Sequence, residues 1–388
     1  MEIRKLRREE MPEAGLISVI AFHARLQEIE SRRQQMIDNY KNDNWGAFTE
    51  DGTMMARIAD ERFVTRLDGH KIMTSAIGAV STLPEYRVGG AVRNMFEVIL
   101  PDMRKEGIVI STLFPFNHAF YRKFGYELCY AKTEFELPVA SLRGYQFGGW
   151  AKMWHPGETT ELFGEVYEAC NKKYNLAFVR DEAVMARHVN GVYWKDGRFC
   201  YLLGDEDGPC AFVCYDDQQA DGGRMIAIED CAFDGKRGLY ALLGFLARFT
   251  ADYKKVRIPM PTDIDLNNLV NDPYSVTTRK AHNYMLRVVN VPKALALMKK
   301  PADAPFTIAV VDELIPENAG KWHVKGDQVE KTEQAADIEV SVHALSPMLV
   351  GHLSLSEAEL RPDVAVFANR ETLEKTFVKK PAFLTDHF

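Results

Sequence analysis

The sequence contains Pro84-Glu85-Tyr86-Arg87-Val88-Gly89-Gly90, a corner rich in residues that interrupt helices and strands. An alternating segment over 72–80 precedes this corner and predicts a strand. A helical pattern follows from Gly90 to Lys105, with apolar residues spaced so that they share one face. An apolar run over 108–114 then predicts a buried strand. Strand, glycine corner, helix and strand, in this order, form a layout that binds phosphate groups.

The corner suits a pyrophosphate for two reasons. Gly89 and Gly90 carry no Cβ atom, so the backbone can approach a ligand closely. The first turn of the following helix leaves several N–H groups without intrahelical partners, and the helix dipole is positive there. The spacing Arg/Gln-x-x-Gly occurs six times in the chain, but only the instance at Arg87 lies between a strand pattern and a helix pattern. The sequence therefore predicts the phosphate site at this corner.

Three segments carry a resemblance to a known family. They are Arg87-Val88-Gly89-Gly90-Ala91-Val92-Arg93, then Phe120-Tyr121-Arg122-Lys123-Phe124-Gly125-Tyr126, and the C-terminus at Phe388. Together they resemble the Eis family of the GNAT superfamily of acyl-CoA N-acyltransferases. Val92 departs from the general GNAT signature, which has Gly or Ala at that position. The resemblance implies an acetyl-CoA-dependent N-acetyltransferase.

The chain is too long, at 388 residues, for one ordinary core, which predicts two or three domains. A second set of elements repeats the order of the first, but its corner at Gly238 has Gly235, and not Arg or Gln, three residues earlier. The resemblance implies a mixed αβ (α+β) fold with two tandem GNAT-like domains and a small sterol-carrier-like α+β domain. We expect these at residues 1–137, 138–291 and 292–388, with the second GNAT-like domain degenerate.

The resemblance also assigns acetyl-CoA, the only co-substrate expected, to the corner and its neighbours. In the family, the strand before the corner pairs with the CoA arm, the corner binds the pyrophosphate, and two residues after the next strand lie beside the arm. The corresponding residues here are Val80, Ser81, Thr82, Arg87, Val88, Gly89, Gly90, Ala91, Val92, Arg93, Phe116 and Asn117. No Cys or His spacing suits zinc, so we expect no metal.

The implied reaction is direct attack of an amine on the thioester, with two protein groups that move protons. Tyr121 is the candidate acid, because a phenol with a pKa near ~10 can protonate the departing thiolate. Tyr126 is a near neighbour of the same type. By the resemblance, the free carboxylate of Phe388 is the candidate base, acting on an amine bound in its neutral form. His118 and His387 are weaker candidates, since neither has a carboxylate at a readable spacing.

Composition narrows the class of protein. A hydrophobic content of 46% and a charged content of 27% are typical of a soluble globular protein. No apolar run approaches the ~20 residues that cross a bilayer, and the segment 1–10 lacks a signal-peptide core. The net charge of −7 and the lack of a basic stripe argue against nucleic acid. Lys299-Lys300 is interpreted as the solvated end of an element. We expect a cytoplasmic protein.

Several functions stay open at this point. The favoured one is N-acetylation of primary amines on a cationic small molecule, aminoglycoside-like by the resemblance. Polyamines and protein lysine side chains are alternative acceptors. A non-catalytic lipid or acyl-CoA carrier, working through the C-terminal domain, and a silent CoA-binding scaffold are functions of other classes. The resemblance also implies a homo-hexamer.

Two local expectations concern helices. An apolar face is predicted to be buried in a first helix, on residues Met11, Leu16, Val19, Ile20 and Phe22. Pro101 lies inside the helix predicted over 90–105, where it removes a backbone hydrogen bond. We expect it to kink or end that helix.

Overall fold

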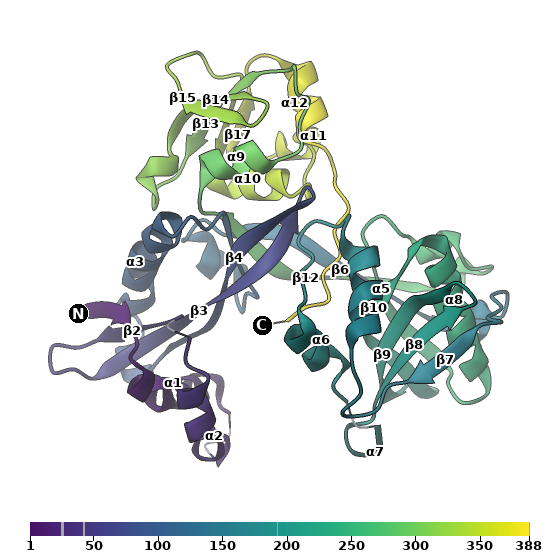
Figure 1. Ribbon diagram of the computed structural model, residues 1–388. Helices are drawn as coiled ribbons and strands as arrows, with labels where there is room; N and C mark the ends of the chain where they lie inside the picture. The colour runs from purple at the N-terminus through teal and green to yellow at the C-terminus, as the bar shows by residue number, and fades with distance from the viewer. Residues whose placement is uncertain (25–26, 42, 192, 388) are drawn as a thin grey trace.

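The computed structural model describes residues 1–24, 27–41, 43–191 and 193–387. The fold is mixed αβ, as predicted, and the chain forms three units (Figure 1). The first two units share one sheet of 12 strands, and the third has a separate sheet of 5 strands. Figure 1 shows the third unit above the junction of the other two.

The first unit buries the face of α3 (Ala91–Lys105) that the sequence predicts, with Met95, Phe96 and Ile99 fully buried. Of the two effects expected of Pro101, an end to the helix does not occur, since α3 continues to Lys105. The buried residues Leu100 and Met103 on either side of it hold the last turn in the core, which compensates for one missing backbone bond. The other elements of this unit are β1 (Glu2–Lys5), α1 (Met11–Phe22), α2 (Gln27–Asp38), β2 (Asn44–Phe48), β3 (Met54–Leu67), β4 (His70–Thr82), β5 (Ile110–Leu113), α4 (His118–Arg122) and β6 (Glu127–Pro138).

The predicted buried face of α1 is wrong. The structure buries Ala14 and Ile17, whereas Leu16, Ile20 and Phe22 are each more than a third exposed. Apolar residues occur on all sides of this helix, so periodicity alone does not select the side that packs. Small side chains decide it, because they allow α1 to lie close to β3 and β4.

The second unit repeats the order of the first, with helices before a run of antiparallel strands and a helix after the corner. Its elements are β7 (Trp150–Met153), α5 (Glu161–Asn171), α6 (Glu182–Val189), α7 (Tyr193–Asp196), β8 (Arg198–Asp205), β9 (Gly208–Ala220), β10 (Gly223–Phe233), α8 (Gly235–Ala247), β11 (Lys255–Met260) and β12 (Thr277–Val288). Its core is separate from that of the first unit, and α8 contributes Leu242, Leu243 and Leu246 to it.

One strand crosses between the units. The strand order of the large sheet is β1-β2-β3-β4-β5-β12-β6-β11-β10-β9-β8-β7. β12, the last strand of the second unit in sequence, therefore lies between β5 and β6 of the first and pairs antiparallel with both. β6 in turn pairs antiparallel with β11 of the second unit. The two units are thus joined through backbone hydrogen bonds and not only through side chains.

The third unit has its own five-stranded sheet, whose two edge strands, β15 (Gln328–Lys331) and β17 (Val364–Val366), are short. Its strand order is β15-β14-β13-β16-β17, with β13 and β16 parallel. Its elements are α9 (Val291–Leu297), β13 (Phe306–Val311), β14 (Gly320–Lys325), β15 (Gln328–Lys331), β16 (Ile338–Ser341), α10 (Val342–Leu349), α11 (Leu355–Ala358), β17 (Val364–Val366) and α12 (Arg370–Thr376).

A buried ion pair fixes the third unit to β12. The guanidinium of Arg287, which is 1% exposed, donates to both carboxylate oxygens of Asp312 at 2.6 and 2.8 Å. Its other terminal nitrogen donates to the Phe124 carbonyl at 2.6 Å. A Cβ atom at Gly125 would lie 1.8 Å from this nitrogen, and the φ of Gly125 is +80°. Glycine is therefore required after α4, both for the turn and for the guanidinium.

Candidate active site

A cavity of about 840 Å³ lies at the corner between β4 and the start of α3. Ten of the twelve residues predicted to bind acetyl-CoA line it, all but Gly89 and Asn117. The sequence predicts no acetyl-CoA contact for the other lining residues. The full lining is Ala21, Phe22, Val80, Ser81, Thr82, Tyr86, Arg87, Val88, Gly90, Ala91, Val92, Arg93, Phe116, Phe120, Lys123 and Phe124.

The corner has the geometry of an anion site. Gly90, the residue before α3, has a φ of +78°, and no atom lies within 4 Å of the position that its Cβ would occupy. No side chain caps the N-terminus of α3, so the first N–H groups of this helix are available to a ligand. Arg87, Arg93 and Lys123 line the same cavity, and no Asp or Glu is among its described lining residues. The positive end of the helix dipole and the positively charged side chains therefore both favour an anion at this corner.

Val88 carries backbone strain at this corner. Its φ is +70°, a region that β-branched residues rarely adopt, and its side chain is fully exposed. Such a conformation costs on the order of 1–3 kcal/mol and persists only where the surrounding structure enforces it. The exposed side chain gains no burial in return. The strain is consistent with a corner whose backbone, and not its side chain, is the functional part.

The strand before the corner has a bulge. Ala59 of β3 pairs with Gly78 of β4, but Arg57 pairs with Ser81, so β4 holds one extra residue. Ala79 at this bulge has a φ of +47°, and the Ser81 hydroxyl donates to its carbonyl at 3.0 Å. A bulge turns the backbone N–H groups next to it out of the ladder. The bulge therefore lies at the edge of the cavity, which Val80, Ser81 and Thr82 line, and the Ser81 side chain holds its geometry.

The two parallel strands at the site separate beside this bulge. β4 pairs with β5 only from Thr74 with Ile110 to Ile77 with Leu113, where β5 ends. β4 continues to Thr82, which lines the cavity. An extended ligand can therefore lie along the last residues of β4, where it meets backbone groups as a strand would.

The two tyrosines of the motif have different surroundings. Tyr126 is fully buried, and its hydroxyl lies 2.7 Å from the Ser111 Oγ. Tyr121 is 3% exposed and packs edge-on against Phe116, a cavity-lining residue, at 5.4 Å between ring centroids. Burial raises the pKa of the Tyr121 phenol, so that it stays protonated at neutral pH. Of the two, Tyr121 is the one next to the cavity.

Asn117 and Gly89 lie at the site without lining the cavity. The side-chain oxygen of Asn117 accepts a hydrogen bond from the backbone N–H of Phe120 at 3.1 Å, so Asn117 caps α4. The Gly89 N–H donates to the Tyr86 carbonyl at 3.4 Å, which closes the corner. Both residues shape elements that carry lining residues. Their direct contact with acetyl-CoA stays a prediction.

Other lining residues could be found from sequence only in part. Phe120, Lys123 and Phe124 belong to the motif around Tyr121 and carry a local signal. Ala21 and Phe22 come from the end of α1, and no sequence spacing relates that helix to α3.

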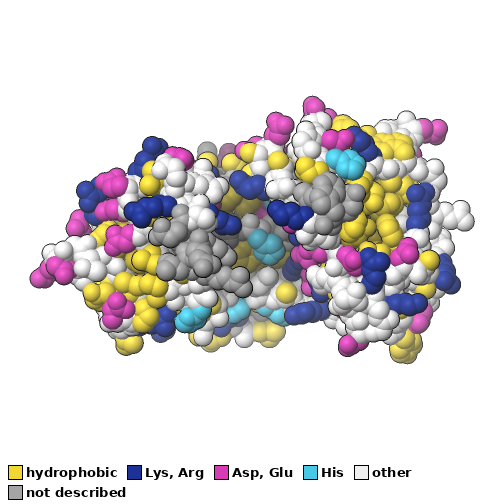
Figure 2. All heavy atoms as spheres, turned by 90° about the horizontal axis from the view of Figure 1, so that it is seen from below, with side chains coloured by type: hydrophobic (Ala, Val, Ile, Leu, Met, Phe, Trp, Pro, Cys, Tyr) yellow, Lys and Arg dark blue, Asp and Glu magenta, His cyan; other side chains and the backbone are white. Residues whose placement is uncertain are grey.

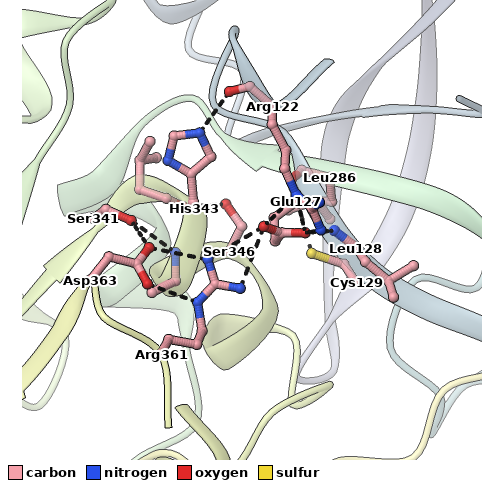
Figure 3. A network of polar contacts seen from close by, with 12 residues as sticks. Arg122, Glu127, Leu128, Cys129, Leu286, Ser341, His343, Ser346, Arg361 and Asp363 are labelled. Carbon is pink, nitrogen blue, oxygen red and sulfur yellow. Dashed lines mark hydrogen bonds and ion pairs between the residues drawn. The ribbon is translucent and has the colours of Figure 1, made fainter. Parts of the chain in front are cut away.

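A polar network fixes α4 to the third unit (Figure 3). Glu127 accepts hydrogen bonds from Arg122 at 2.7 Å and from Arg361 of the third unit at 3.3 Å. Arg361 also pairs with Asp363 at 2.9 Å, and His343 Nε2 lies 2.7 Å from the Arg122 carbonyl oxygen. Burial opposes ionisation of Glu127, but the hydrogen bonds from Arg122 hold the pKa of its carboxyl below the ordinary value. The residue after Tyr121 is thus tied to another unit.

The C-terminal tail approaches the same region. After α12 it runs down between the first two units (Figure 1). The guanidinium of Arg180 is fully buried and donates to Asp386 at 2.9 Å and to Asp230 at 2.6 Å. The next residue, His387, has its ring 5.1 Å from that of Phe114, which follows β5. Phe388, the predicted base, lies outside the described residues.

A second contact holds the same stretch of tail. The backbone N–H of Leu384 donates to the Tyr130 hydroxyl of β6 at 3.3 Å, and Thr385 donates to Asp230 at 2.6 Å. Burial opposes ionisation of Asp230, but Arg180 and His188 together hold the pKa of its carboxyl well below the ordinary range. Strand β6 and the second unit therefore both fix the tail just before its end. Seen from below, the surface between the first two units is hollowed, and histidine side chains lie at this hollow (Figure 2).

The corresponding corner of the second unit is filled by protein. A Cβ atom at Gly238, in the first turn of α8, would lie 2.1 Å from the Cys210 carbonyl oxygen. Arg237 pairs with Asp205 and donates to the Gly208 carbonyl at 2.7 Å. The start of α8 therefore packs on the β8–β9 hairpin, whereas the start of α3 lies beside a cavity.

Matches to known domain families agree with this architecture. Residues 2–129 and residues 176–288 each match an acetyltransferase (GNAT) domain, and residues 291–385 match a sterol carrier protein domain. An uncharacterized N-acetyltransferase of Streptomyces coelicolor is 23% identical over 313 residues, which are 74% of each chain. The chain is an N-acetyltransferase of the GNAT type with an Eis-like architecture.

Solved structures show the same arrangement over full length. A GCN5-related N-acetyltransferase from Anabaena variabilis superposes with a TM-score of 0.87 at 21% identity, covering 100% of both chains. Eis1 from Mycobacterium abscessus superposes with a TM-score of 0.84 at 22% identity, again over 100% of both chains. These likenesses establish the fold of this GNAT enzyme, with its sterol-carrier-like third domain. No helix in the described part of the chain is long and apolar enough to span a membrane.

The corner makes a direct prediction for acetyl-CoA binding. Gly90→Glu places a carboxylate in the open space before α3, where it repels a pyrophosphate, and the affinity for acetyl-CoA falls by ~10-fold or more. Gly52→Glu is the matched control, because Gly52 also has a left-handed φ, +87°, with open space around it, yet lies in the β2–β3 turn. Isothermal titration with acetyl-CoA compares the two variants. Equal affinities would contradict the assignment of the corner.

Proposed function

We propose that this enzyme transfers the acetyl group of acetyl-CoA to a primary amine of a cationic small molecule of the aminoglycoside type. The cavity at the start of α3 carries the proposal, because it combines an uncapped helix N-terminus with Arg87, Arg93 and Lys123. The cationic acceptor is supported by the net charge of −7 and by the Eis-like architecture. Polyamines and protein lysine side chains are the competing acceptors.

The proposed chemistry needs one proton donor and one proton acceptor. The amine nitrogen attacks the thioester carbonyl carbon, an amide forms, and the C–S bond breaks. The Tyr121 hydroxyl gives its proton to the departing thiolate, whose own proton affinity the apolar surroundings also raise. The proton lost by the nitrogen goes to the Phe388 carboxylate, and exchange with solvent restores both groups.

Acetyl transfer against a panel of amines tests the proposed function. The purified protein is incubated with acetyl-CoA and, in turn, an aminoglycoside, a polyamine and a lysine peptide, and mass spectrometry counts the acetyl groups added. We expect acetylated aminoglycoside together with stoichiometric free CoA. Acetylation of the polyamine or the peptide alone would replace the proposed acceptor. Binding of acetyl-CoA without transfer to any amine would contradict the catalytic role.

Removing the Tyr121 hydroxyl tests the acid. Tyr121→Phe keeps the ring in its aromatic packing, so we expect turnover to fall ~10²-fold with little change in acetyl-CoA affinity. Tyr126→Phe is the control, because it deletes a hydroxyl that contacts Ser111 in the same core. Full activity of Tyr121→Phe, or an equal loss in both variants, would return Tyr121 to a packing role.

Extending the chain by one residue tests the base. The extension keeps the Phe388 ring and moves the terminal carboxylate, so we expect turnover to fall while acetyl-CoA affinity stays unchanged. The tail contacts at Asp386 and Leu384 support this role, because they hold the chain just before its end. Phe388→Ala keeps the terminal carboxylate and separates the contribution of the ring. An extended protein that folds and acetylates at the parent rate would rule out the carboxylate.

A homo-hexamer is proposed as the assembly, from the Eis resemblance. The exposed apolar side chains of Leu16 and Ile20 on α1 support an interface, because a partner subunit would remove them from water. Light scattering measures the mass, and a monomer at assay concentration would contradict the hexamer.

A cytoplasmic location is also proposed, supported by six cysteines that are all free and buried. Cell fractionation tests it.

A further inference from the structure

A second cavity, of about 730 Å³, lies where all three units meet. The first unit contributes the β3–β4 turn, the second contributes the residues after α5, and the third contributes the segments after α9 and around the end of α12. It shares no lining residue with the cavity at α3. The lining residues are Asp68, Gly69, Lys172, Lys173, Asn175, Lys299, Lys300, Pro301, Lys375, Val378, Lys379, Lys380 and Pro381. We call it the lysine groove.

The lysine groove concentrates lysine side chains in a protein of net charge −7. Seven of its 13 lining residues are lysines, and one, Asp68, is acidic. The Asp68 carboxylate is already occupied. It accepts hydrogen bonds from the Lys380 ammonium at 2.6 Å, from the Lys299 backbone N–H at 2.7 Å and from the Asn175 amide at 3.1 Å. Asp68 therefore holds the three units together and does not neutralise the remaining lysines.

The lysines divide into fixed and uncommitted ones. Lys300 donates to the carbonyl oxygens of Leu295, Ala296 and Met298 at 2.7 to 3.0 Å, which fixes its ammonium at the end of α9. Burial lowers the pKa of Lys300, and the nearby charge of Lys380 lowers it further.

Three more lysines are paired at the rim of the groove. Their partners are Asp263 for Lys173, Glu371 for Lys375 and Glu357 for Lys379. The ammonium groups of Lys172 and Lys299 make no hydrogen bond or ion pair with any residue that the structure describes. Both side chains belong to exposed residues, so they are free to move onto a ligand.

This arrangement points to a ligand with several negative charges. Four of the seven ammonium groups are paired with carboxylates, but those of Lys172, Lys299 and Lys300 have no carboxylate partner among the described residues. Holding these three positive charges near one another costs electrostatic free energy, which an anion would recover. Lysine ammonium groups are point charges that suit phosphate oxygens. None of the described lining residues is aromatic, so the groove offers no stacking surface of the kind that binds nucleic-acid bases. Its volume suits a small molecule.

We propose that the lysine groove binds a small polyphosphorylated anion, at a site separate from the acetyl-CoA cavity. Each unit supplies part of the lining, so a bound anion links the three units and favours their native packing. Binding therefore raises the thermal midpoint of the whole protein in proportion to ligand saturation. It also weakens as salt concentration rises, because exposed charges make the contacts.

Titration with inorganic tripolyphosphate tests the proposal, with acetyl-CoA present at saturation so that its cavity is filled. We expect a thermal midpoint that rises with tripolyphosphate, and calorimetric binding that falls ~10-fold or more in the variant Lys172→Glu with Lys299→Glu. Neither ammonium group makes a hydrogen bond or ion pair with a described residue, and the backbone bond from Lys299 to Asp68 does not involve the side chain that is changed. ATP is titrated in parallel, and a preference for ATP over tripolyphosphate would identify a nucleotide as the occupant.

A matched control keeps the net charge equal. Lys236→Glu with Lys325→Glu changes the same total charge at two exposed lysines outside the groove. We expect tripolyphosphate binding within ~2-fold of the parent in this control. An equal loss in both double variants would mean diffuse attraction by the surface, and no binding to the parent protein would overturn the site. Acetyl-CoA affinity is measured in the same variants and should not change, which separates this test from that of the acetyltransferase function.

Discussion

The side chain of Arg287 connects the parts of this molecule more directly than any sequence motif does. It comes from β12, the strand that leaves the second unit and completes the sheet of the first. Its guanidinium is buried against Asp312 of the third unit and against the carbonyl at the end of α4. Loss of one partner of such a pair leaves a buried charge uncompensated and costs roughly 3–5 kcal/mol. The packing of all three units therefore depends on this pair.

These contacts between units also fix the position of α4 at the candidate active site. Tyr121 lies on α4, a helix of only five residues, too short to be stable alone. It is held by the Phe124 carbonyl bond to Arg287, by the Glu127 network to Arg361 and by the aromatic packing around Phe96. Two of these three supports come from outside the first unit. The third domain thus stabilises the candidate acid without lining the acetyl-CoA cavity.

Duplication of one fold has produced two unlike corners. At α3, Gly90 has open space before it, and the backbone of Val88 is strained. At α8, Gly238 allows the helix to pack on the Cys210 carbonyl, and the space where a ligand would lie is filled. Glycine serves both corners, for ligand approach in one and for helix packing in the other. The sequence predicts a degenerate second site because Gly238 has no Arg or Gln three residues before it. In the structure, protein atoms fill the corner at that glycine.

Local patterns predicted part of this structure and failed elsewhere for identifiable reasons. The corner at Arg87 and the buried face of α3 follow from spacing along a short segment, and ten of the twelve proposed acetyl-CoA residues line one cavity. The place of β12 between β5 and β6 rests on pairing between residues more than 140 positions apart, which no local pattern reports. The interpretation of Lys299 and Lys300 as solvated ends agrees with the exposure of Lys299, whereas the Lys300 ammonium is half-buried and bonded to three carbonyl oxygens. The lysines that line the same groove, Lys172 and Lys380, are distant in sequence, so no local pattern indicates the groove.

The central claim is that acetyl-CoA binds at one corner of a duplicated fold and not at the other. Hydrogen–deuterium exchange, measured by mass spectrometry with and without saturating acetyl-CoA, compares the two corners in one experiment. We expect slower exchange in residues 79–82 and 88–93, where backbone N–H groups would meet the ligand, and unchanged exchange at the start of α8, residues 235–240. Protection at the start of α8, or no protection at residues 88–93, would contradict it.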